Sequence, residues 1–259
     1  MIDLHAHILP QLDDGAETLD ESIEMCRRSY QDGIRIMVAT PHILEGIYPN
    51  RRSTILAKVQ ELNEALTKCG VQNSCASTHP RFDALTILPG ADVHFSLDMP
   101  QLCENGDIVT VNDKGQYLMV EFDSQGIPYH AEDVLFRLMT KGIIPIITHP
   151  ERNFEIGQRP QRYGEMIRMG CLGQVTAMSL TGGFGAGVKR IAEKLLKNRL
   201  VHIIASDTHS VTDRPPILSL AVREAEKMVG REEAQKMVTD YPQAILEGKK
   251  PDVPQAIPI

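Results

Sequence analysis

Short apolar segments rich in isoleucine and valine recur along the whole chain. They lie at 1–5, 34–40, 85–93, 117–122, 143–149, 171–176 and 201–206. These runs are too short for typical helices, and most show no alternation between apolar and polar positions. Such runs are typical of parallel strands that are buried on both faces. The pattern therefore predicts a series of buried strands spread over the chain.

Amphipathic stretches with helical spacing separate these strands. The stretch at 17–33 has Thr18 as a predicted N-cap, Glu21 three residues later and Gly33 as its stop. The others lie at 51–69, 130–141, 160–169, 185–198, 215–229 and 231–246. This alternation predicts an α/β protein with parallel strands. A closed (β/α) barrel of seven or eight strands suits the length, while a doubly wound open sheet has the same periodicity and remains the alternative.

Composition and charge narrow the class of protein. The chain has 259 residues, of which 42% are hydrophobic and 24% charged, as in an ordinary globular protein with one large domain. We expect that domain over 1–247, followed by a loosely ordered, proline-punctuated C-terminal tail over 248–259. The net charge of -7 disfavours nucleic acid as a partner, because nucleic-acid binders normally carry a basic face.

Cysteine usage and hydropathy indicate the cellular compartment of the protein. The five cysteines form no C-x-x-C pair, which is typical of free thiols in a reducing compartment. We expect no signal peptide, because no basic segment with a long apolar run lies before the first predicted strand, and no apolar run reaches the roughly 18 residues that a membrane helix needs. We therefore expect a cytoplasmic protein with no membrane insertion.

Histidine and carboxylate residues end, or directly follow, most of the predicted strands. His5 and His7 share one face of the first strand, with Asp13 and Asp14 just beyond. The other strand ends carry His42, Asp92, Glu121, His149, Asp207 and His209. In a parallel barrel the carboxyl ends of the strands converge on one face, where active sites form. A lone histidine could be an ordinary core residue, but the repetition over many strands predicts one shared site.

Nine of these residues are candidate metal ligands: His5, His7, Asp14, His42, Asp92, Glu121, His149, Asp207 and His209. Nine exceed what one ion can bind, and would suit two or three divalent ions with bridging carboxylates. Mixed imidazole and carboxylate ligands fit manganese, iron or zinc rather than calcium or magnesium. Neighbouring ions of this kind activate water and clamp the entering and leaving oxygens, so the set predicts hydrolysis, most commonly of phosphoesters.

Two arginines follow the same strand ends. Arg152 comes directly after "HPE", and Arg214 lies in "SDTHSVTDRPP". Guanidinium groups match phosphate oxygens in a bidentate manner. We therefore predict that both arginines bind the phosphate of a substrate at the mouth of the barrel.

The segment "CASTHPR" suggests a different chemistry. Cys75 and Arg81 have the C-x5-R spacing of cysteine-dependent tyrosine phosphatases. That chemistry needs a loop of backbone N–H groups around the phosphate and a thiol of lowered pKa. Pro80 removes one N–H, no glycine lies between Cys75 and Arg81, and the segment precedes a strand. We interpret this cysteine as incidental.

Several motifs together resemble the polymerase-and-histidinol-phosphatase (PHP) superfamily: "HAH", "TPH", "VEF", "HPERN" and "SDTH". Within it the chain is similar to the manganese-dependent protein-tyrosine phosphatases of bacterial capsule and exopolysaccharide synthesis. That likeness rests on "HILPQLDDGAET", "ATPHILEGIYPN", "EFDSQGIP", "PIITHPERN", "SLTGGFG" and "SDTHSVTDRPP", which span residues 1 to about 220. The resemblance implies a distorted, TIM-like (β/α)7 barrel of the PHP type.

The resemblance also implies an arrangement of three ions. The first would bind His5, His7 and Asp207, and the third Asp14, His42 and His209. The second would lie near His149, with Glu121 and Asp92 as carboxylate ligands. Asp92 stands in "GADV" where the family usually has glutamate, and the shorter side chain draws the carboxylate back by about a bond length. His94 could compensate on the same strand face, although a bystander role is the expectation.

The implied activity is hydrolysis of phosphotyrosine, with Arg152 and Arg214 binding the phosphate and two or three divalent ions, manganese foremost, as cofactors. Asp207 and His209 are both considered for the general acid. The implied partner is the phosphotyrosine-bearing tail of a bacterial tyrosine kinase of polysaccharide assembly, and homo-oligomer formation stays open. Alternatives are a small-molecule phosphatase of the histidinol-phosphate type, a non-catalytic regulator of polysaccharide assembly, and a metal-dependent amide hydrolase or nuclease.

Overall fold

The computed structural model describes residues 1–72 and 85–259, and within them all strand pairs are parallel. One sheet has the order β1-β2-β4 and the other β3-β5-β6-β7-β8-β9. The segment "CASTHPR" lies outside the described residues. The strands are β1 (Ile2–Ala6), β2 (Ile36–Ala39), β3 (His42–Ile43), β4 (Thr86–Pro89), β5 (Asp92–His94), β6 (Tyr117–Glu121), β7 (Ile144–Thr148), β8 (Leu172–Thr176) and β9 (Ile203–Ala205).

Two strand regions differ from the prediction. The predicted strand at 34–40 holds β2, and a further short strand, β3, follows it after Thr40 and Pro41, while the predicted strand 85–93 is divided into β4 and β5 at Gly90 and Ala91. Pro41 has no N–H to continue a ladder. A Cβ on Gly90 would lie 2.6 Å from Cγ1 of Val38, so glycine permits the close approach to β2. Joined across these breaks, the strands give the seven that the sequence predicts.

The two sheets meet again between β1 and β9. The contact is a single bridge, Ala6 with Thr208, rather than a continuous ladder. The N–H of Asp207 donates to the carbonyl of His5 at 2.9 Å, and the N–H of His7 donates to the carbonyl of Thr208 at 2.9 Å. This seam and the two breaks make the arrangement a distorted barrel.

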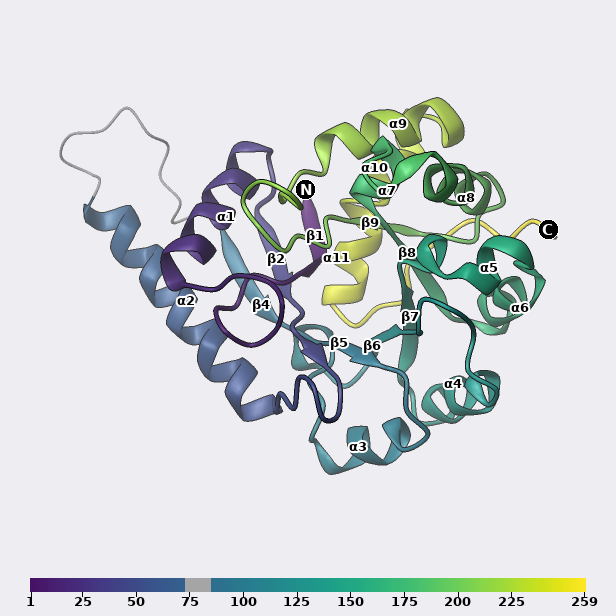
Figure 1. Cartoon of the computed structure of the whole chain (residues 1–259), viewed down its shortest axis with the longest axis horizontal. Helices are drawn as coiled ribbons and strands as arrows, with labels where there is room; N and C mark the ends of the chain where they lie inside the picture. The colour runs from purple at the N-terminus through teal and green to yellow at the C-terminus, as the bar shows by residue number, and fades with distance from the viewer. Residues whose placement is uncertain (73–84) are drawn as a thin grey trace.

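Helices surround the strands (Figure 1). The N-cap prediction for the first helix is confirmed, because the hydroxyl of Thr18 accepts from the N–H of Glu21. The predicted helix 231–246 is two helices, and α3, α5 and α7, with five to seven residues each, are too short to give a periodic signal. The helices are α1 (Leu19–Gln31), α2 (Arg52–Gln72), α3 (Met99–Asn105), α4 (Ala131–Thr140), α5 (Phe154–Gln158), α6 (Gln161–Met169), α7 (Ala177–Thr181), α8 (Gly185–Lys197), α9 (Ser219–Val229), α10 (Arg231–Lys236) and α11 (Asp240–Leu246), with 3-10 turns η2 (Val111–Asp113) and η3 (Pro150–Arg152).

The C-terminal segment 248–259 is irregular but packs on the barrel. Pro251 is buried, and the N–H of Ile257 donates to the carbonyl of Asn198 at 2.9 Å. Val253 and Ile259 contact the hydrophobic core. These contacts join the tail to the barrel. Among the helices of residues 1–72 and 85–259, none combines the length and the apolar character needed to cross a bilayer.

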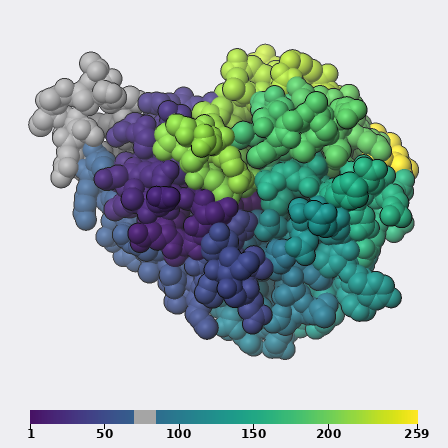
Figure 2. Space-filling view, in the orientation of Figure 1, coloured from purple at the N-terminus to yellow at the C-terminus, as the bar shows by residue number. Residues whose placement is uncertain are grey.

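The carboxyl ends of the strands meet on the face shown in Figure 2. The dark purple segment after β1, the blue segment after β3 and the light green segment after β9 adjoin there, although the sequence separates them widely. Their imidazoles confirm the proximity: the ring centroids of His7 and His42 are 4.4 Å apart, and those of His7 and His209 are 3.9 Å apart. The fold therefore brings distant strand ends to one mouth.

Candidate metal centre

The mouth of the barrel gathers all nine candidate ligands and both candidate arginines. Polar atoms of each residue lie 3.6 Å or less from those of another member. The residues are His5, His7, Asp14, His42, Asp92, Glu121, His149, Arg152, Asp207, His209 and Arg214. The convergence expected from the strand ends is therefore present in the structure.

The members of each set that the resemblance implies lie near one another, but the ligand atoms within 4.8 Å also group differently, as His5 with His7 and Asp92, and as His42 with Asp92 and Glu121. Nε2 of His5 and of His7 lie 3.5 and 3.6 Å from Oδ1 of Asp207. Nε2 of His149 lies 3.4 Å from Oε1 of Glu121 and 3.7 Å from Oδ2 of Asp92.

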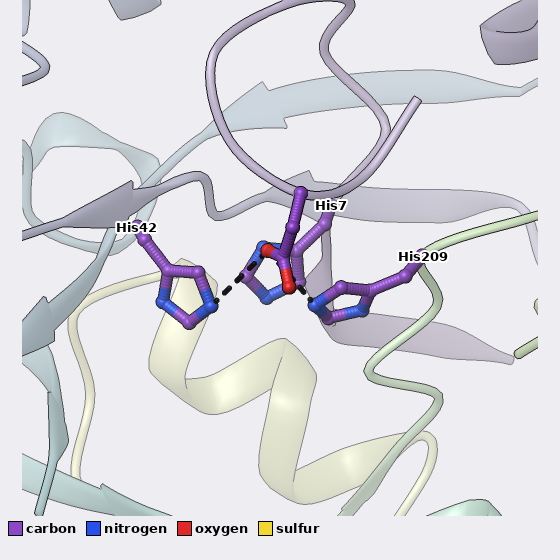
Figure 3. Close-up of side chains that lie close together, drawn as sticks. His7, His42 and His209 are labelled. Carbon is purple, nitrogen blue, oxygen red and sulfur yellow. Dashed lines mark ion pairs between the residues drawn. The ribbon is translucent and has the colours of Figure 1, made fainter. Parts of the chain in front are cut away.

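The third set lies at the more open side of the mouth. Oδ1 of Asp14 is 3.6 Å from Nε2 of His42 and 3.5 Å from Nε2 of His209. Figure 3 shows the imidazoles of His7, His42 and His209 turned toward one another, and the ligand atoms of all four residues lie within 4.8 Å. His7 thus faces both the first and the third set.

Acceptors fix the Nδ1 side of three of these imidazoles. They are Oε1 of Gln174 for His5 at 3.0 Å, Oδ2 of Asp13 for His7 at 2.6 Å, and the carbonyl of Asp207 for His209 at 3.0 Å. A carboxylate or a carbonyl can only accept, so we assign the ring hydrogen to Nδ1. Gln174 Oε1 also accepts from the N–H of His149 at 3.3 Å, which supports the orientation of its amide. Each Nε2 then presents a lone pair to the centre, as in metal-binding histidines.

Two observations show that these residues fit a cation. Nε2 of His5 and Nε2 of His7 are 3.0 Å apart, and with both hydrogens on Nδ1 their lone pairs oppose each other. Oδ2 of Asp92 is buried with no hydrogen-bond partner among the described residues, 3.5 to 3.7 Å from nitrogens of His5, His42 and His149. Ligands about 2.0–2.2 Å from one ion are separated by about 3 Å from each other, so a cation would satisfy both features.

The shorter side chain of Asp92 still reaches the centre. Its other oxygen, Oδ1, accepts from the hydroxyl of Thr148 at 3.1 Å, which orients the carboxylate. His94 points to the same region, with Nδ1 3.7 Å from Oε2 of Glu121, and its side chain is 21% exposed. His94 therefore lies next to the carboxylate of Glu121, whereas Asp92 faces the imidazole nitrogens of His5, His42 and His149.

The electrostatics of the mouth favour a positive ion. Burial lowers the pKa of His5 and of His7, so both imidazoles are neutral and able to bind metal. Burial also acts to lower the pKa of His42, but Glu121 and Asp92 outweigh it and raise that pKa to about 9. A site that draws a proton onto His42 has an excess of negative charge, which a divalent ion would neutralise.

Asp207 joins this centre to the two arginines. Its Oδ1 faces the imidazoles, while Oδ2 accepts from Nη1 of Arg152 at 2.5 Å and lies 2.6 Å from Nη2 of Arg214. Burial would raise the pKa of Asp207, but the guanidinium groups of Arg214 and Arg152 help to hold it well below its usual range. The carboxylate is therefore ionised and lies between the imidazole cluster and the two arginines.

The backbone is unusual at two of these positions. His149 has φ of 33° and Asp207 has φ of 52°, a left-handed conformation that is uncommon for residues other than glycine. Each residue directly follows a strand or its short extension, β7 or β9, and turns its side chain into the mouth. Such strain is concentrated at functional sites, where the surrounding structure maintains it.

Two residues that hold the imidazoles were not assigned this role from the sequence. Asp13 was noted beside the candidate ligands but given no role of its own, and it contacts the Nδ1 side of His7 and accepts from the N–H of His42 at 2.9 Å. Gln174 is fully buried inside the apolar run 171–176, and a buried amide in a strand is the signal that could have revealed it.

Comparison with known proteins places the chain in a family. A family model described as capsular polysaccharide synthesis, CpsB/CapC, matches residues 1–247. The chain belongs to this family. The CpsB/CapC relatives include tyrosine-protein phosphatase YwqE of Bacillus subtilis, which is 35% identical over 90% of this chain and 86% of its own length. The putative tyrosine-protein phosphatase CapC of Staphylococcus aureus is 36% identical over 84% of this chain and 80% of its own.

The CpsB/CapC assignment extends to the three-dimensional structure. One similar crystal structure comes from work on YwqE of Bacillus subtilis and CpsB of Streptococcus pneumoniae, described as unique metal-dependent tyrosine phosphatases. It superimposes with a TM-score of 0.92 at 33% identity and covers 100% of this chain and 99% of that chain. The expected family and the barrel fold are both confirmed.

Proposed function

We propose that the protein is a metal-dependent protein-tyrosine phosphatase. The observation that carries the proposal is the position of Asp207, whose two carboxylate oxygens face the imidazole cluster on one side and Arg152 and Arg214 on the other. A phosphate monoester needs both features at once, a cation centre for its oxygens and guanidinium groups for its charge. The names of the CpsB/CapC relatives support phosphotyrosine as the substrate.

We propose two or three divalent ions, with manganese foremost and iron or zinc as alternatives. The three sets of ligands around Asp207, Asp92 and Asp14 support this number. Imidazole with carboxylate, and no thiolate, suits these metals. When bound, the ions supply Lewis acidity toward the phosphoryl oxygens and activate the attacking water.

The side chains of the protein supply orientation and charge. Arg152 and Arg214 converge on one oxygen of Asp207, so their N–H groups are already directed to the region where a phosphoryl group would lie. In phosphoryl transfer, charge spreads over the equatorial oxygens, and guanidinium groups stabilise it. The acceptors behind His5, His7 and His209 keep those rings from rotating during turnover.

Neither candidate for the general acid is well placed to give up a proton. Asp207 is ionised, because its positive neighbours hold its pKa well below the usual range. The Nδ1 hydrogen of His209 is donated to the carbonyl of Asp207, and its Nε2 faces Asp14 in the third ligand set. A phenolate leaving group, whose conjugate acid has a pKa of about 10, needs less help from a proton donor to depart than an alkoxide does. This difference favours phosphotyrosine over alkyl phosphates.

We propose that the physiological partner is the phosphotyrosine-bearing tail of a bacterial tyrosine kinase that acts in polysaccharide assembly. The family's link to capsular polysaccharide synthesis and the tyrosine-phosphatase names of its members support this partner.

The test uses metal-stripped protein that is reloaded with manganese, iron or zinc. We expect metal-dependent turnover of a phosphotyrosine peptide well above that of histidinol phosphate. Asp207→Ala should abolish turnover, while Asp133→Ala, which removes an exposed carboxylate on α4, should leave it unchanged. Absence of turnover with every metal, or preference for histidinol phosphate, would contradict the proposal.

A further inference from the structure

An aromatic ring lies beside both arginines of the mouth. Cζ of Arg152 is 5.1 Å from the centroid of the Phe184 ring, and Cζ of Arg214 is 5.7 Å from it. Both distances fall within the roughly 6 Å over which a guanidinium is attracted to a ring face. The ring of half-buried Phe184 therefore contacts two guanidinium groups that come from different segments of the chain.

Glycines on both sides of Phe184 determine where its ring lies. In "TGGFG", Gly182 has φ of 91° and Gly185 has φ of 90°, conformations that other residues rarely adopt. A Cβ on Gly183 would lie 2.6 Å from Cε of Met178, so the turn packs closely on α7. The three glycines form a compact turn between α7 and α8 with Phe184 near its end.

Phe184 also occupies a position that usually has a different chemistry. It is the N-cap of α8, where serine, threonine, aspartate or asparagine normally accept a hydrogen bond from the first turn. Phenylalanine has no such acceptor, and no side-chain cap forms there. The Phe184 side chain therefore makes no capping contact with α8 and lies against the two arginines instead.

The arginines need a contact that does not use their N–H groups. Nη1 of Arg152 donates to Oδ2 of Asp207, and Nη2 of Arg214 lies 2.6 Å from that same oxygen while it donates to the backbone carbonyl of Asp207 at 3.0 Å. Two positive groups at one oxygen repel each other. Nε of Arg214 is buried and has no hydrogen-bond partner in the part of the chain that the structure describes. A ring face attracts the cations while the N–H donors, which lie in the guanidinium plane, stay available for oxygens.

We propose that Phe184 is a positioning residue that holds Arg152 and Arg214 ready for the substrate phosphate. Its ring keeps both guanidinium groups in place while their hydrogen bonds change from Asp207 to phosphate oxygens. The inference rests on the proposed function, since it assigns the two arginines to the phosphate.

The test compares Phe184→Leu, which keeps apolar bulk without a ring face, with Phe184→Tyr, which keeps the ring. Binding of inorganic phosphate to metal-loaded protein is measured by calorimetry, and KM and kcat are measured with a phosphotyrosine peptide. We expect Phe184→Leu to weaken phosphate binding and raise KM by about three- to tenfold, with kcat changed less and metal content unchanged. Phe184→Tyr should stay close to wild type.

The two proposals fail in different ways. Wild-type phosphate affinity in Phe184→Leu, or an equal loss in Phe184→Tyr, would overturn the positioning role. If the wild-type protein binds phosphate but hydrolyses no phosphotyrosine, the proposed function fails, and weaker phosphate binding in Phe184→Leu alone would still support the positioning role. If Phe184→Leu folds poorly by thermal melting, Phe184→Met makes the same comparison.

Discussion

Each side chain at the mouth either faces the proposed cation centre or holds a group that faces it. His7 illustrates the division, because Nε2 faces Asp207 while Nδ1 contacts Asp13. Asp92 combines both relations, with Oδ1 held by Thr148 and Oδ2 directed at three imidazoles. Changes on the two sides should therefore have different consequences.

Asp13→Ala removes the acceptor behind His7. We expect metal affinity to fall about 10- to 100-fold, as is typical when an outer partner of a ligating histidine is lost, because the ring can then rotate and change its tautomer. Competition of manganese with a fluorescent chelator measures this affinity. Asp20→Ala, in the first turn of α1, is the matched control and should bind metal as wild type does. Equal affinity in the two variants would contradict the role of Asp13.

Asp92→Asn keeps the shape of the side chain and removes its charge. We expect a larger loss of metal affinity than in Asp13→Ala, because the change affects an oxygen that faces the centre itself. In the metal-free state we expect the free energy of unfolding in urea to change little, because the variant removes both the desolvation of a buried charge and its attraction for His42. A variant that binds manganese normally would show that Asp92 is not a ligand.

The sequence predicted the residues directed at the centre of the mouth better than the residues that hydrogen-bond to them from behind. His5, Glu121 and Asp207 could be found because each ends or follows an apolar run, and strand ends converge in a parallel barrel. Gln174 and the true role of Asp13 could not, because they depend on which imidazole nitrogen they contact. That information exists only in three dimensions.

At the scale of elements, loops after the strands carry most of the chemistry, and their shape depends on close packing. The loop that follows β1 returns at Ala16, whose N–H donates to the carbonyl of His7 at 3.2 Å. It brings Asp13 and Asp14 back over the strand that carries His5. Gly15 lies where this loop passes closest to His7.

Gly15→Ala should disturb this loop. The added Cβ would lie 2.2 Å from the carbonyl oxygen of His7 and 2.6 Å from its Cβ, so the backbone must move. We expect a loss of about 1–3 kcal/mol in the free energy of unfolding in urea, together with weaker metal binding.

Gly187→Ala in α8 is the control, because nothing lies within 4 Å of the added Cβ. It should stabilise the protein by up to about 1 kcal/mol, since alanine favours the helix. If both substitutions had the same effect, the packing account of the first loop would be wrong.

Element boundaries were predictable where local signals exist. The N-cap of α1 at Thr18 follows from its hydroxyl and from Glu21 three residues later, and the structure confirms it. The division at Gly90 was missed because the apolar run continues through it, and β3 was missed because it lies beyond the end of the run at 34–40. The change of sheet is decided by the neighbouring strand. Short helices such as α7 carry too few residues for a periodic pattern.

For the whole molecule, the strand count and the parallel arrangement followed from the sequence, while the closure did not. Periodicity cannot separate a barrel from an open sheet, because both alternate strands and helices. The seam of β1 with β9 depends on polar contacts: buried Asp3 accepts from the N–H of Ser206 at 3.0 Å and from its hydroxyl at 2.5 Å. Such pairing over 203 residues is not a local signal.

The pH dependence of unfolding should report on His202, which lies at the amino end of β9, away from the metal centre. Burial lowers the pKa of His202 to about 4, whereas the unfolded chain has a value near 6.5. The unfolded state therefore binds the proton first, and stability falls as the pH drops from 6.5 to 4. Protonation of His202 in the unfolded chain should lower the free energy of unfolding by about 3 kcal/mol between pH 6.5 and pH 4.

His202→Asn isolates this contribution, because its side-chain oxygen can replace Nδ1 as the acceptor for the N–H of Gly173. Urea unfolding at several pH values should show a smaller loss on acidification for the variant, by about 3 kcal/mol. Parallel curves for the two proteins would rule out His202 as the source.

The most direct test of the central claim is anomalous diffraction at the manganese edge from crystals grown with manganese. The account predicts two or three peaks at the mouth of the barrel, each about 2.0–2.3 Å from atoms of the ligand sets, with Nε2 of His5 and His7 sharing one ion. Peaks confined to other surfaces, or none at the mouth with manganese in excess, would contradict a cation centre built from these strand ends.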